Sequence, residues 1–175
     1  SQPMPLVFTG PASSAGYFEE IQRFLAATLG PRALECFRVI IGDPAEVARA
    51  MTRGMDAVRE FRRRNSDAYN YNWLLRVSAE LQQPFEVSHE SMARLELEPG
   101  LPPHQLASEL RRAFSGIVTG NVKEHGIRMI EDGGPFELRG TPQLLGPLDA
   151  LLRSFVRDRR MKIAGEYQPC YRIVT

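Results

Sequence analysis

Two short apolar runs separated by a long helical pattern constrain the fold of this chain more than any other feature of its sequence. Residues 6–8 form a continuous apolar run that ends at Thr9-Gly10-Pro11, and residues 37–41, apolar except for Arg38, predict the next strand. Continuous apolar runs of this length are typical of parallel strands that are buried on both faces. With a helix after each run and short connections, the first 65 residues are predicted to form a βαβ unit.

Both expected helices of this unit have clear start and stop signals. Ser13 or Ser14 is the expected cap of the first helix, and Gly30-Pro31 is expected to end it. Asp43-Pro44-Ala45-Glu46 predicts the start of the second, with Asp as the N-cap and Pro at the first position. The expected buried stripes are Phe18, Ile21, Leu25 and Leu29 in the first helix, and Val47, Met51, Met55, Val58 and Phe61 in the second.

The pattern changes after Arg62-Arg63-Arg64-Asn65, and we expect a domain boundary there, with domains at 1–65 and 66–175. The second domain is predicted to contain β-like pieces at 73–78 and 93–97, helices at 103–119 and 121–132, a strand at 136–139, a long helix from Pro142 and a final strand at 171–174. This irregular order favours an α+β layer with a mostly antiparallel sheet under helices. The expected fold class is therefore α/β followed by α+β.

The long helix from Pro142 carries the broadest apolar stripe of the chain. Its spacing is that of a face turned toward a core. The stripe consists of Leu144, Leu145, Leu148, Leu151, Leu152, Phe155 and Val156.

Composition narrows the function classes. The formal net charge is +1 and the sequence pI is near 7.8. The chain as a whole therefore has no strong positive electrostatic field that would attract nucleic acid or an acidic membrane. No apolar run approaches the ~20 residues of a membrane span, and the start of the chain does not resemble a signal peptide. Cys36 and Cys170 are too few for a disulfide framework, so we expect reduced thiols and a cytoplasmic protein.

The sharpest electrostatic feature is an arginine cluster in the second helix. Six arginines stand against Asp56 and Glu60 between positions 49 and 64, a local balance of +4 on a nearly neutral chain. The planar guanidinium fork binds phosphate in bidentate fashion. A solvated helix face, or ion pairs to a neighbouring domain, explains such a cluster equally well. The arginines are Arg49, Arg53, Arg59, Arg62, Arg63 and Arg64.

A second group of cations lies between residues 110 and 125. At helical spacing, Arg111 and Arg112 fall on a polar face, where they predict either a phosphate contact or a solvated surface. Asn121 and Glu124 are spaced as a capping box. Lys123 would then lie in a first helical turn, where it opposes the helix dipole unless it meets a carboxylate or a phosphate; a surface lysine is the alternative.

The remaining polar residues give weaker signals. His89, His104 and His125 lack metal-ligand spacing with one another or with the cysteines, so we expect no metal site. The alternating residues Asp67, Tyr69, Tyr71 and Trp73 favour core packing or an interface over base stacking. Thr9 and Gly10 lie at the carboxyl end of an expected parallel strand, the edge where open α/β sheets bind ligands.

Three stretches of the chain resemble the C-terminal region of the long bacterial nucleotide 5′-monophosphate nucleosidases of the LOG (Lonely Guy) family. They are residues 67–97, LRRAFSGIVTGNVKEHGIRMIEDGGPFELRG at 110–140 and MKIAGEYQPCYRIVT at 161–175. Two further runs are similar to the closing strand, helix, strand and helix of the Rossmann-like LOG nucleotide-binding domain. They are PLVFTGPASSAGYFEEIQRFLAATLG at 5–30 and FRVIIGDPAEVARAMTRGM at 37–55. The resemblance covers essentially the whole chain.

The resemblance implies hydrolysis of the N-glycosidic bond of nucleoside monophosphates by the complete enzyme, and control by guanosine polyphosphate alarmones. We expect no cofactor. We also expect a homo-oligomer, because the strands at Leu6 and Phe37 would otherwise expose an apolar sheet. It makes Arg62, Arg63 and Arg64 the first candidates for alarmone contacts, followed by Arg111, Arg112 and Lys123. Thr9 and Gly10 would line a nucleotide pocket made mainly by other sequence.

The chain departs from the family at one decisive place. LOG proteins carry the string PGGxGTxxE, whose glycines approach a phosphate and whose Glu takes part in cleavage, and this string is absent here. Gly133-Gly134 is followed by Pro135 and predicts a helix stop. We therefore expect a C-terminal portion or a stand-alone relative, inactive by itself. The rival hypothesis is a non-catalytic interaction or oligomerisation module that uses the stripe at 144–156; general RNA binding is disfavoured by the charge.

Overall fold

Helices account for 63% of the residues that the structure describes, which are 4–65, 83–163 and 166–174 of a computed structural model. Short 3₁₀ helices flank the first α-helix. In chain order the elements are β1 (Val7–Gly10), η1 (Ala12–Ser14), α1 (Ala15–Leu29), η2 (Pro31–Cys36), β2 (Arg38–Ile41), α2 (Pro44–Arg64), α4 (His89–Ala93), α5 (Pro103–Val122), α6 (Glu124–Gly133), β3 (Phe136–Arg139), α7 (Pro142–Arg157) and β4 (Tyr171–Val174).

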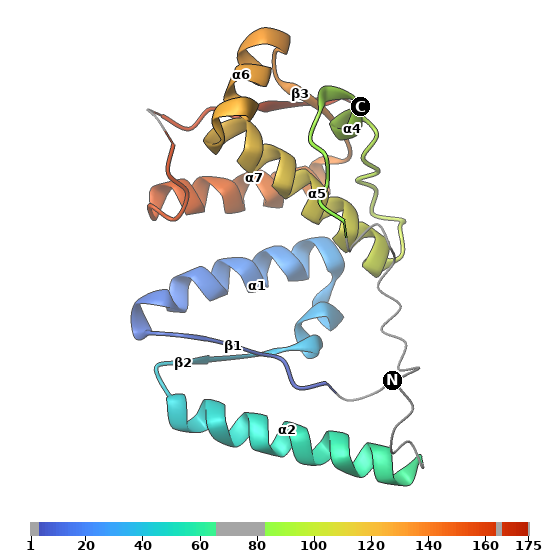
Figure 1. Ribbon diagram of the computed structural model, residues 1–175, viewed down its shortest axis with the longest axis vertical. Helices are drawn as coiled ribbons and strands as arrows, with labels where there is room; N and C mark the ends of the chain where they lie inside the picture. The colour runs from blue at the N-terminus through green and yellow to red at the C-terminus, as the bar shows by residue number, and fades with distance from the viewer. Residues whose placement is uncertain (1–3, 66–82, 164–165, 175) are drawn as a thin grey trace.

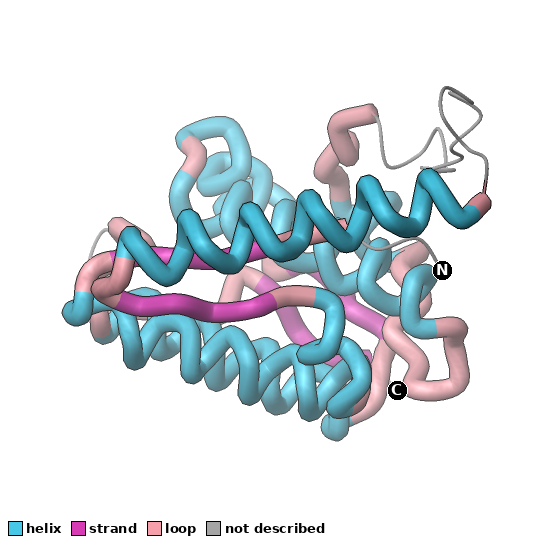
Figure 2. The backbone as a smooth tube through the Cα atoms, turned by 90° about the horizontal axis from the view of Figure 1, so that it is seen from below, coloured by secondary structure: helices cyan, strands magenta, loops and turns pink. Residues whose placement is uncertain are grey.

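The predicted βαβ unit is confirmed. β1 and β2 pair in parallel, with Val7 opposite Arg38 and Gly10 opposite Ile41. Figure 1 shows α1 on one face of this pair and α2 on the other, and Figure 2, seen from below, shows α2 in front of the two strands and running roughly along them. A parallel pair needs a long crossover connection, which α1 supplies.

The start of α2 is confirmed at the atomic level. Asp43 is the N-cap, its carboxylate accepts the Glu46 amide at 2.8 Å, and Pro44 takes the first helical position. The cap of α1 differs from the prediction. Ser14 holds the N-cap position, but its hydroxyl donates to the Pro11 carbonyl at 2.7 Å and does not cap the helix. Gly30, with φ of +84°, ends α1 as expected.

The expected buried stripe of α2 is partly wrong. Val58 is buried, and Ala50 is buried beside it, whereas Met51 and Met55 are 37% and 42% exposed. The physical reason is the width of the sheet. The sheet beside this helix has two strands, β1 and β2, and these cover only part of its apolar face.

The predicted antiparallel sheet of the second half is wrong. β3 and β4 pair in parallel, with Phe136 opposite Tyr171 and Arg139 opposite Val174, and the isolated bridge from Leu97 to Gly140 is also parallel. No antiparallel strand pair occurs among the described residues. The reason is that α7 carries the chain back along the sheet between the two strands, as α1 does in the first unit.

Neither of the two β-like pieces expected before residue 100 is a strand among the described residues. The segment 93–97 is not a strand, because α4 includes Ala93 and Leu97 contributes one bridge only. The segment 73–78 lies outside the described residues, as do Asp67, Tyr69, Tyr71 and Trp73.

The predicted helix break at Gly120 is also wrong, because α5 continues through it to Val122. Gly120 is required by packing, since a Cβ there would lie 2.8 Å from the Cys170 sulfur. Asn121 lies inside α5 and donates to the Ile117 carbonyl at 2.9 Å, so it caps no following helix. The predicted stop at Gly133-Gly134 is confirmed, with α6 ending at Gly133 and Gly134 at φ of +77°.

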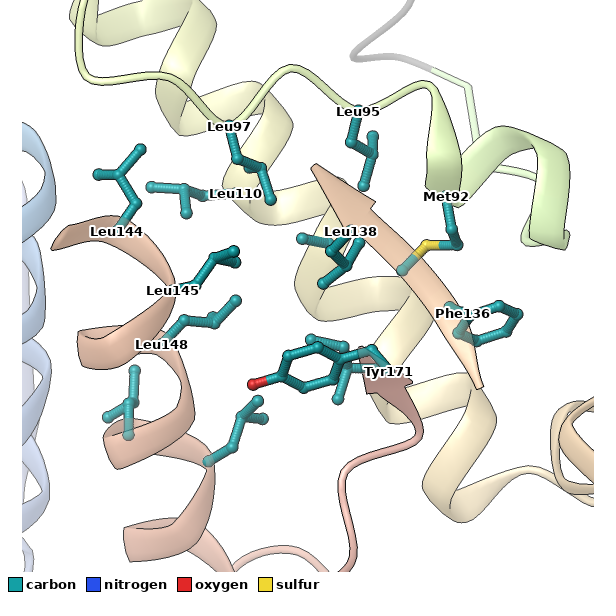
Figure 3. Packing of buried hydrophobic residues seen from close by; sticks show 14 of the residues in the cluster. Met92, Leu95, Leu97, Leu110, Phe136, Leu138, Leu144, Leu145, Leu148 and Tyr171 are labelled. Carbon is teal, nitrogen blue, oxygen red and sulfur yellow. The ribbon is translucent and has the colours of Figure 1, made fainter. Parts of the chain in front are cut away.

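One hydrophobic core fills the second half of the chain. The apolar stripe of α7 packs against β3, α4 and α5 (Figure 3). The fully buried side chains are Phe136, Met92, Leu97, Ile117, Leu138, Leu144, Leu145, Leu148 and Leu152. Leu151 is buried as well, and Phe155 and Val156 are partly buried. The stripe at 144–156 is therefore core, and it is not available as the partner-binding surface of the rival hypothesis.

The core extends from the second half into α1. Phe24 belongs to it, and Ile21, Leu25 and Leu29 pack against it. The rings of Phe24 and Phe114 meet edge to face with centroids 5.6 Å apart. α1 consequently lies between the β1–β2 pair and α7 (Figure 1). The domain boundary near residue 65 stays a prediction.

Candidate functional site

The arginines of α2 form an ion-paired helix face. Glu46 accepts from Arg49 at 2.8 Å and from Arg53 at 2.6 Å, and these two hydrogen bonds lower the pKa of its carboxyl group. Arg59 pairs with Asp56 at 3.0 Å. All of these side chains are at least partly exposed. The first half of the arginine cluster is thus a surface ion-pair network, one of the alternatives to a phosphate site.

The last turn of α2 repeats this sharing of one carboxylate by two arginines, with more exposed side chains. Arg63 and Arg64 share one carboxylate, that of Glu60, at 3.0 Å and 2.8 Å, and both guanidinium groups remain largely exposed. Arg62, beside them in sequence, is partly buried. Two cations on one carboxylate leave a positive surplus, which the negative end of the helix dipole tolerates.

Arg111 and Arg112, adjacent in α5, have different surroundings. Arg111 is exposed. Arg112 is partly buried, pairs with Glu109 at 2.7 Å and lies over the ring of Phe85 with its central carbon 6.0 Å from the ring centroid. Glu109 also accepts the Glu96 amide at 3.2 Å. Arg112 therefore helps to fasten the segment before α4 to α5, a structural role that the sequence did not indicate.

Lys123 is exposed and holds the N-cap position of α6, just outside the helix, so the predicted place in a first helical turn is wrong. The repulsion between its ammonium group and the positive end of the helix dipole is correspondingly weaker, because an N-cap residue precedes the first helical turn. From position 111 to the end of α5 the helix rises by about 17 Å. The structure accordingly separates Lys123 from Arg111 and Arg112.

Thr9 and Gly10 are the last two residues of β1. A Cβ on Gly10 would lie 2.3 Å from the Ser14 hydroxyl oxygen, so the tight turn from β1 into α1 requires glycine. β2 ends at the same edge, where Gly42, at φ of +70°, leads into α2. The starts of α1 and α2 thus lie at one edge of the pair (Figure 1).

The structure does not bring the predicted residues into one site. α2 starts at the edge that holds Thr9 and Gly10 and carries Arg62 to Arg64 at its other end, about 30 Å away along a helix of 21 residues. The sequence did not indicate the open cavities of the structure. One, of about 930 Å³, lies beside Thr141 at the carboxyl ends of β3 and β4. Another, of about 1230 Å³, is lined by residues of η2, α1, α2 and the start of α5, including Cys36, Leu29 and His104. No local sequence signal marks it, because its wall comes from distant segments.

Cys170 and His89 have structural roles in the second half of the chain. Burial raises the pKa of the Cys170 thiol to about 12, and this sulfur accepts from Asn121 at 3.0 Å. His89 is held by the Gly134 carbonyl at 2.8 Å and packs on Phe136. In the described part of the chain, no three His, Cys, Asp or Glu side chains gather as metal ligands. Nor does that part contain a helix long and apolar enough to cross a membrane.

Comparison with known proteins defines the class. The family model described as "Pyrimidine/purine nucleotide monophosphate nucleosidase, C-terminal" matches residues 55–174, from the middle of α2 to the end of β4. The chain belongs to this family.

The relatives make the assignment more specific. Proteins named pyrimidine/purine nucleotide 5′-monophosphate nucleosidase from Escherichia coli strain K12, strain O6:H1 and strain O157:H7 are each 51% identical to this chain over 175 residues. The alignment covers 99% of this chain and 38% of each relative. The chain thus spans well under half the length of these relatives and matches their C-terminal region. The expected resemblance is confirmed.

Proposed function

We propose that this chain is the C-terminal part of a nucleotide 5′-monophosphate nucleosidase, which hydrolyses the N-glycosidic bond of purine and pyrimidine ribonucleotides. The observation that carries the proposal is 51% identity over essentially the whole chain with proteins that bear this name. The complete protein would act on nucleoside monophosphates as a cytoplasmic homo-oligomer. The βαβ unit would be the end of its Rossmann-like LOG domain.

Within that enzyme, the chain would cap the nucleotide pocket rather than perform the cleavage. The string PGGxGTxxE is absent from it. Its contribution would be the carboxyl edge of β1 and β2, where Thr9 and Gly10 lie and where both α1 and α2 begin. Ligands of open α/β sheets bind at this edge, which supports the assignment of these residues to the pocket lining.

The second proposed contribution is regulation by a guanosine polyphosphate alarmone. Such a ligand needs several cationic contacts, and the last turn of α2 offers Arg62, Arg63 and Arg64. Arg63 and Arg64 share Glu60 and are 77% and 75% exposed, which supports this choice. Arg49 and Arg53, which share Glu46, are each only 57% exposed. Arg111, Arg112 and Lys123 are the candidates that follow.

The products of the complete polypeptide test the proposed activity. Incubation with AMP and with UMP should release free base and ribose 5-phosphate in equal amounts, measured by chromatography and mass spectrometry. Release of nucleoside and inorganic phosphate would instead identify a phosphatase and contradict the proposal. No product at all from the purified complete polypeptide would contradict it as well.

A further inference from the structure

The end of α7 lies beside the start of α1, on the side of the molecule where β1 and β2 end (left in Figure 1). The rings of Phe155 on α7 and Tyr17 on α1 are 5.5 Å apart, centroid to centroid. The Arg160 guanidinium, just past α7, lies over the same Tyr17 ring, 4.3 Å from its centroid. Both distances are within the range of attractive aromatic and cation–π contacts. Two groups from the second half of the chain thus hold one side chain of α1.

A left-handed turn directs Arg160 toward α1. Arg159 has φ of +56°, and it is the one non-glycine residue with positive φ in the described part of the chain. An arginine rarely adopts this conformation, because its Cβ then approaches the following carbonyl. The amides of Arg160 and Met161 both donate to the Phe155 carbonyl, at 2.7 and 3.0 Å, and Met161 is buried in the core. These contacts hold the turn in place and give Arg160 a defined position.

Tyr17 in turn contacts its neighbour Phe18. The two rings meet edge to face, with centroids 5.2 Å apart. On its other side the Phe18 ring stacks on Phe8 of β1, with centroids 6.2 Å apart. A ring that is in contact on two sides has little freedom to move. The position of Phe18 therefore depends on Tyr17 as well as on the strand.

Phe18 lies directly behind the turn from β1 into α1. A Cβ on Gly10 would lie 3.5 Å from the Phe18 ring and 2.3 Å from the Ser14 hydroxyl oxygen, so the backbone at Gly10 packs closely against both. The amide and the hydroxyl of Ser14 both donate to the Pro11 carbonyl, at 2.9 and 2.7 Å. This compact turn stands at the carboxyl edge of β1, the edge where open α/β sheets bind ligands.

We propose that Tyr17 and Arg160 are positioning residues of the nucleotide site. Arg160 holds the Tyr17 ring, and Tyr17, through Phe18, sets the position of the turn at residues 10–14, which lines the pocket. Neither side chain needs to touch the nucleotide. The inference rests on the proposed function, because it takes this turn as part of the nucleotide pocket.

Steady-state kinetics of the complete polypeptide with AMP test this role. Tyr17→Leu and Arg160→Gln should each raise KM about fivefold or more and change kcat less than about twofold, because a displaced turn weakens substrate and transition-state binding alike. A loss of folded protein would instead lower the apparent kcat and leave KM unchanged. Tyr17→Phe keeps the ring and should restore the wild-type KM. An unchanged KM in either of the first two variants, or no restoration by Tyr17→Phe, would overturn the proposal.

The double variant shows whether Arg160 acts through the Tyr17 ring. Once Tyr17→Leu has removed the ring, the further change Arg160→Gln should have no effect on KM, whereas independent contributions would multiply and would overturn the proposal. Arg157→Gln is the matched control. Arg157 lies in the last turn of α7, is 67% exposed and pairs with Asp158 at 3.0 Å, so its replacement should leave KM and kcat unchanged.

Amide hydrogen exchange of the purified chain tests the same contacts without a nucleotide. The Ser14 amide, which donates to the Pro11 carbonyl, should exchange about fivefold faster or more in Tyr17→Leu and in Arg160→Gln than in the wild type. The Ile127 amide at the start of α6 should keep its rate, which excludes global unfolding as the cause. Equal Ser14 exchange in wild type and variants would overturn the proposal. A complete wild-type polypeptide that releases no base from AMP would contradict the proposed function instead, and the exchange rates would still decide whether Tyr17 and Arg160 hold the turn.

Discussion

The ring of Tyr17 on α1 lies 5.5 Å, centroid to centroid, from the ring of Phe155 on α7. The Arg160 guanidinium stands over the same Tyr17 ring at 4.3 Å. These contacts join the βαβ unit to the second half of the chain at a point remote from the expected boundary near residue 65. A change in the position of α7 relative to the β1–β2 pair must therefore break or move the packing of α1.

The purified chain alone should hydrolyse no nucleoside monophosphate, because the glycine-rich phosphate cradle and the catalytic glutamate of the family are absent from its sequence. Incubation with AMP, GMP, CMP or UMP, followed by chromatography, should show no free base. Base release that stays proportional to the chain through further purification would contradict this expectation.

Arg63→Ala should weaken alarmone binding by about 1.5–3 kcal/mol if Arg63 contacts a phosphate, the range for a hydrogen bond between charged groups. The loss should shrink as salt rises, because screening already reduces the wild-type affinity. In the complete enzyme, alarmone activation should decrease while unstimulated hydrolysis stays nearly unchanged. Titration calorimetry and base release measure the two effects.

Arg59→Ala is the matched control for this experiment. Arg59 lies one turn earlier on α2, is equally exposed and has Asp56 as its own partner at 3.0 Å. It should leave the alarmone affinity unchanged. Wild-type affinity in a variant with Arg62, Arg63 and Arg64 all replaced by alanine would remove this cluster from the site and turn attention to Arg111, Arg112 and Lys123.

The chain should associate in solution through the exposed apolar surface of its first unit. Leu6 and Phe8 of the β1 segment are each 40% exposed, and Met51 and Met55 of α2 are exposed too. Parallel strands are normally covered on both faces, so this surface favours contact with another polypeptide. Light scattering should give a mass above the 19.7 kDa of one chain. A strictly monomeric chain at high concentration would refute this expectation.

Gly126→Ala should destabilise the fold by about 1–3 kcal/mol or more, because a Cβ at this position of α6 would lie 2.2 Å from the Thr119 carbonyl oxygen of α5. Gly146→Ala is the opposite case. Its Cβ, on α7, would meet no atom within 4 Å, so the variant should gain up to about 1 kcal/mol from the higher helix propensity of alanine. Urea unfolding of both variants measures the difference, and equal effects would contradict it.

The stability of the chain should fall above about pH 9 because of Cys170. Burial raises the pKa of this thiol from 9.0 to about 12, so the folded state keeps it neutral where the unfolded state ionises. The stabilising contribution is complete below pH 9 and is lost as the pH rises toward 12, with a slope that approaches about 1.4 kcal/mol per pH unit.

Cys170→Ser tests this origin between pH 9 and 10. Burial also raises the pKa values of Tyr167 and Tyr171, but an unfolded tyrosine is half ionised only at pH 10, whereas the unfolded Cys170 thiol is half ionised at pH 9. In the lower window the variant should therefore lose less stability per pH unit than the wild type, as measured by urea unfolding. Identical slopes would show that another group titrates.

Local signals in the sequence predicted the elements well, and non-local relations were the source of the errors. The Asp43 cap and the stop at Gly134 depend on backbone geometry within a few residues, and both are confirmed. The direction of β4 relative to β3 depends on how α7 crosses the sheet, which no local pattern records. The break expected at Gly120 failed for a similar reason, because the contact that requires glycine comes from Cys170, 50 positions later.

The candidate sites, too, could be predicted from the sequence where their residues are adjacent and not where they come from distant segments. Arg62 to Arg64 are visible as a run in the sequence, and the structure places them together at the end of α2. The cavity beside Thr141 has walls from Arg94, Arg139 and Val174, which are far apart in the chain. The existence of this cavity is a property of the packed protein and has no counterpart in residue spacing.

The parallel pairing of β3 and β4 also constrains how the chain is assembled during synthesis. Phe136 lies opposite Tyr171, so the first strand emerges from the ribosome 35 residues before its partner. At typical translation rates this delay lasts about 2 to 7 s, during which β3 exposes an unpaired edge and the apolar side chains of Phe136 and Leu138. In the interval between those two strands the nascent polypeptide is therefore exposed to aggregation, and a chaperone that covers β3 would protect it.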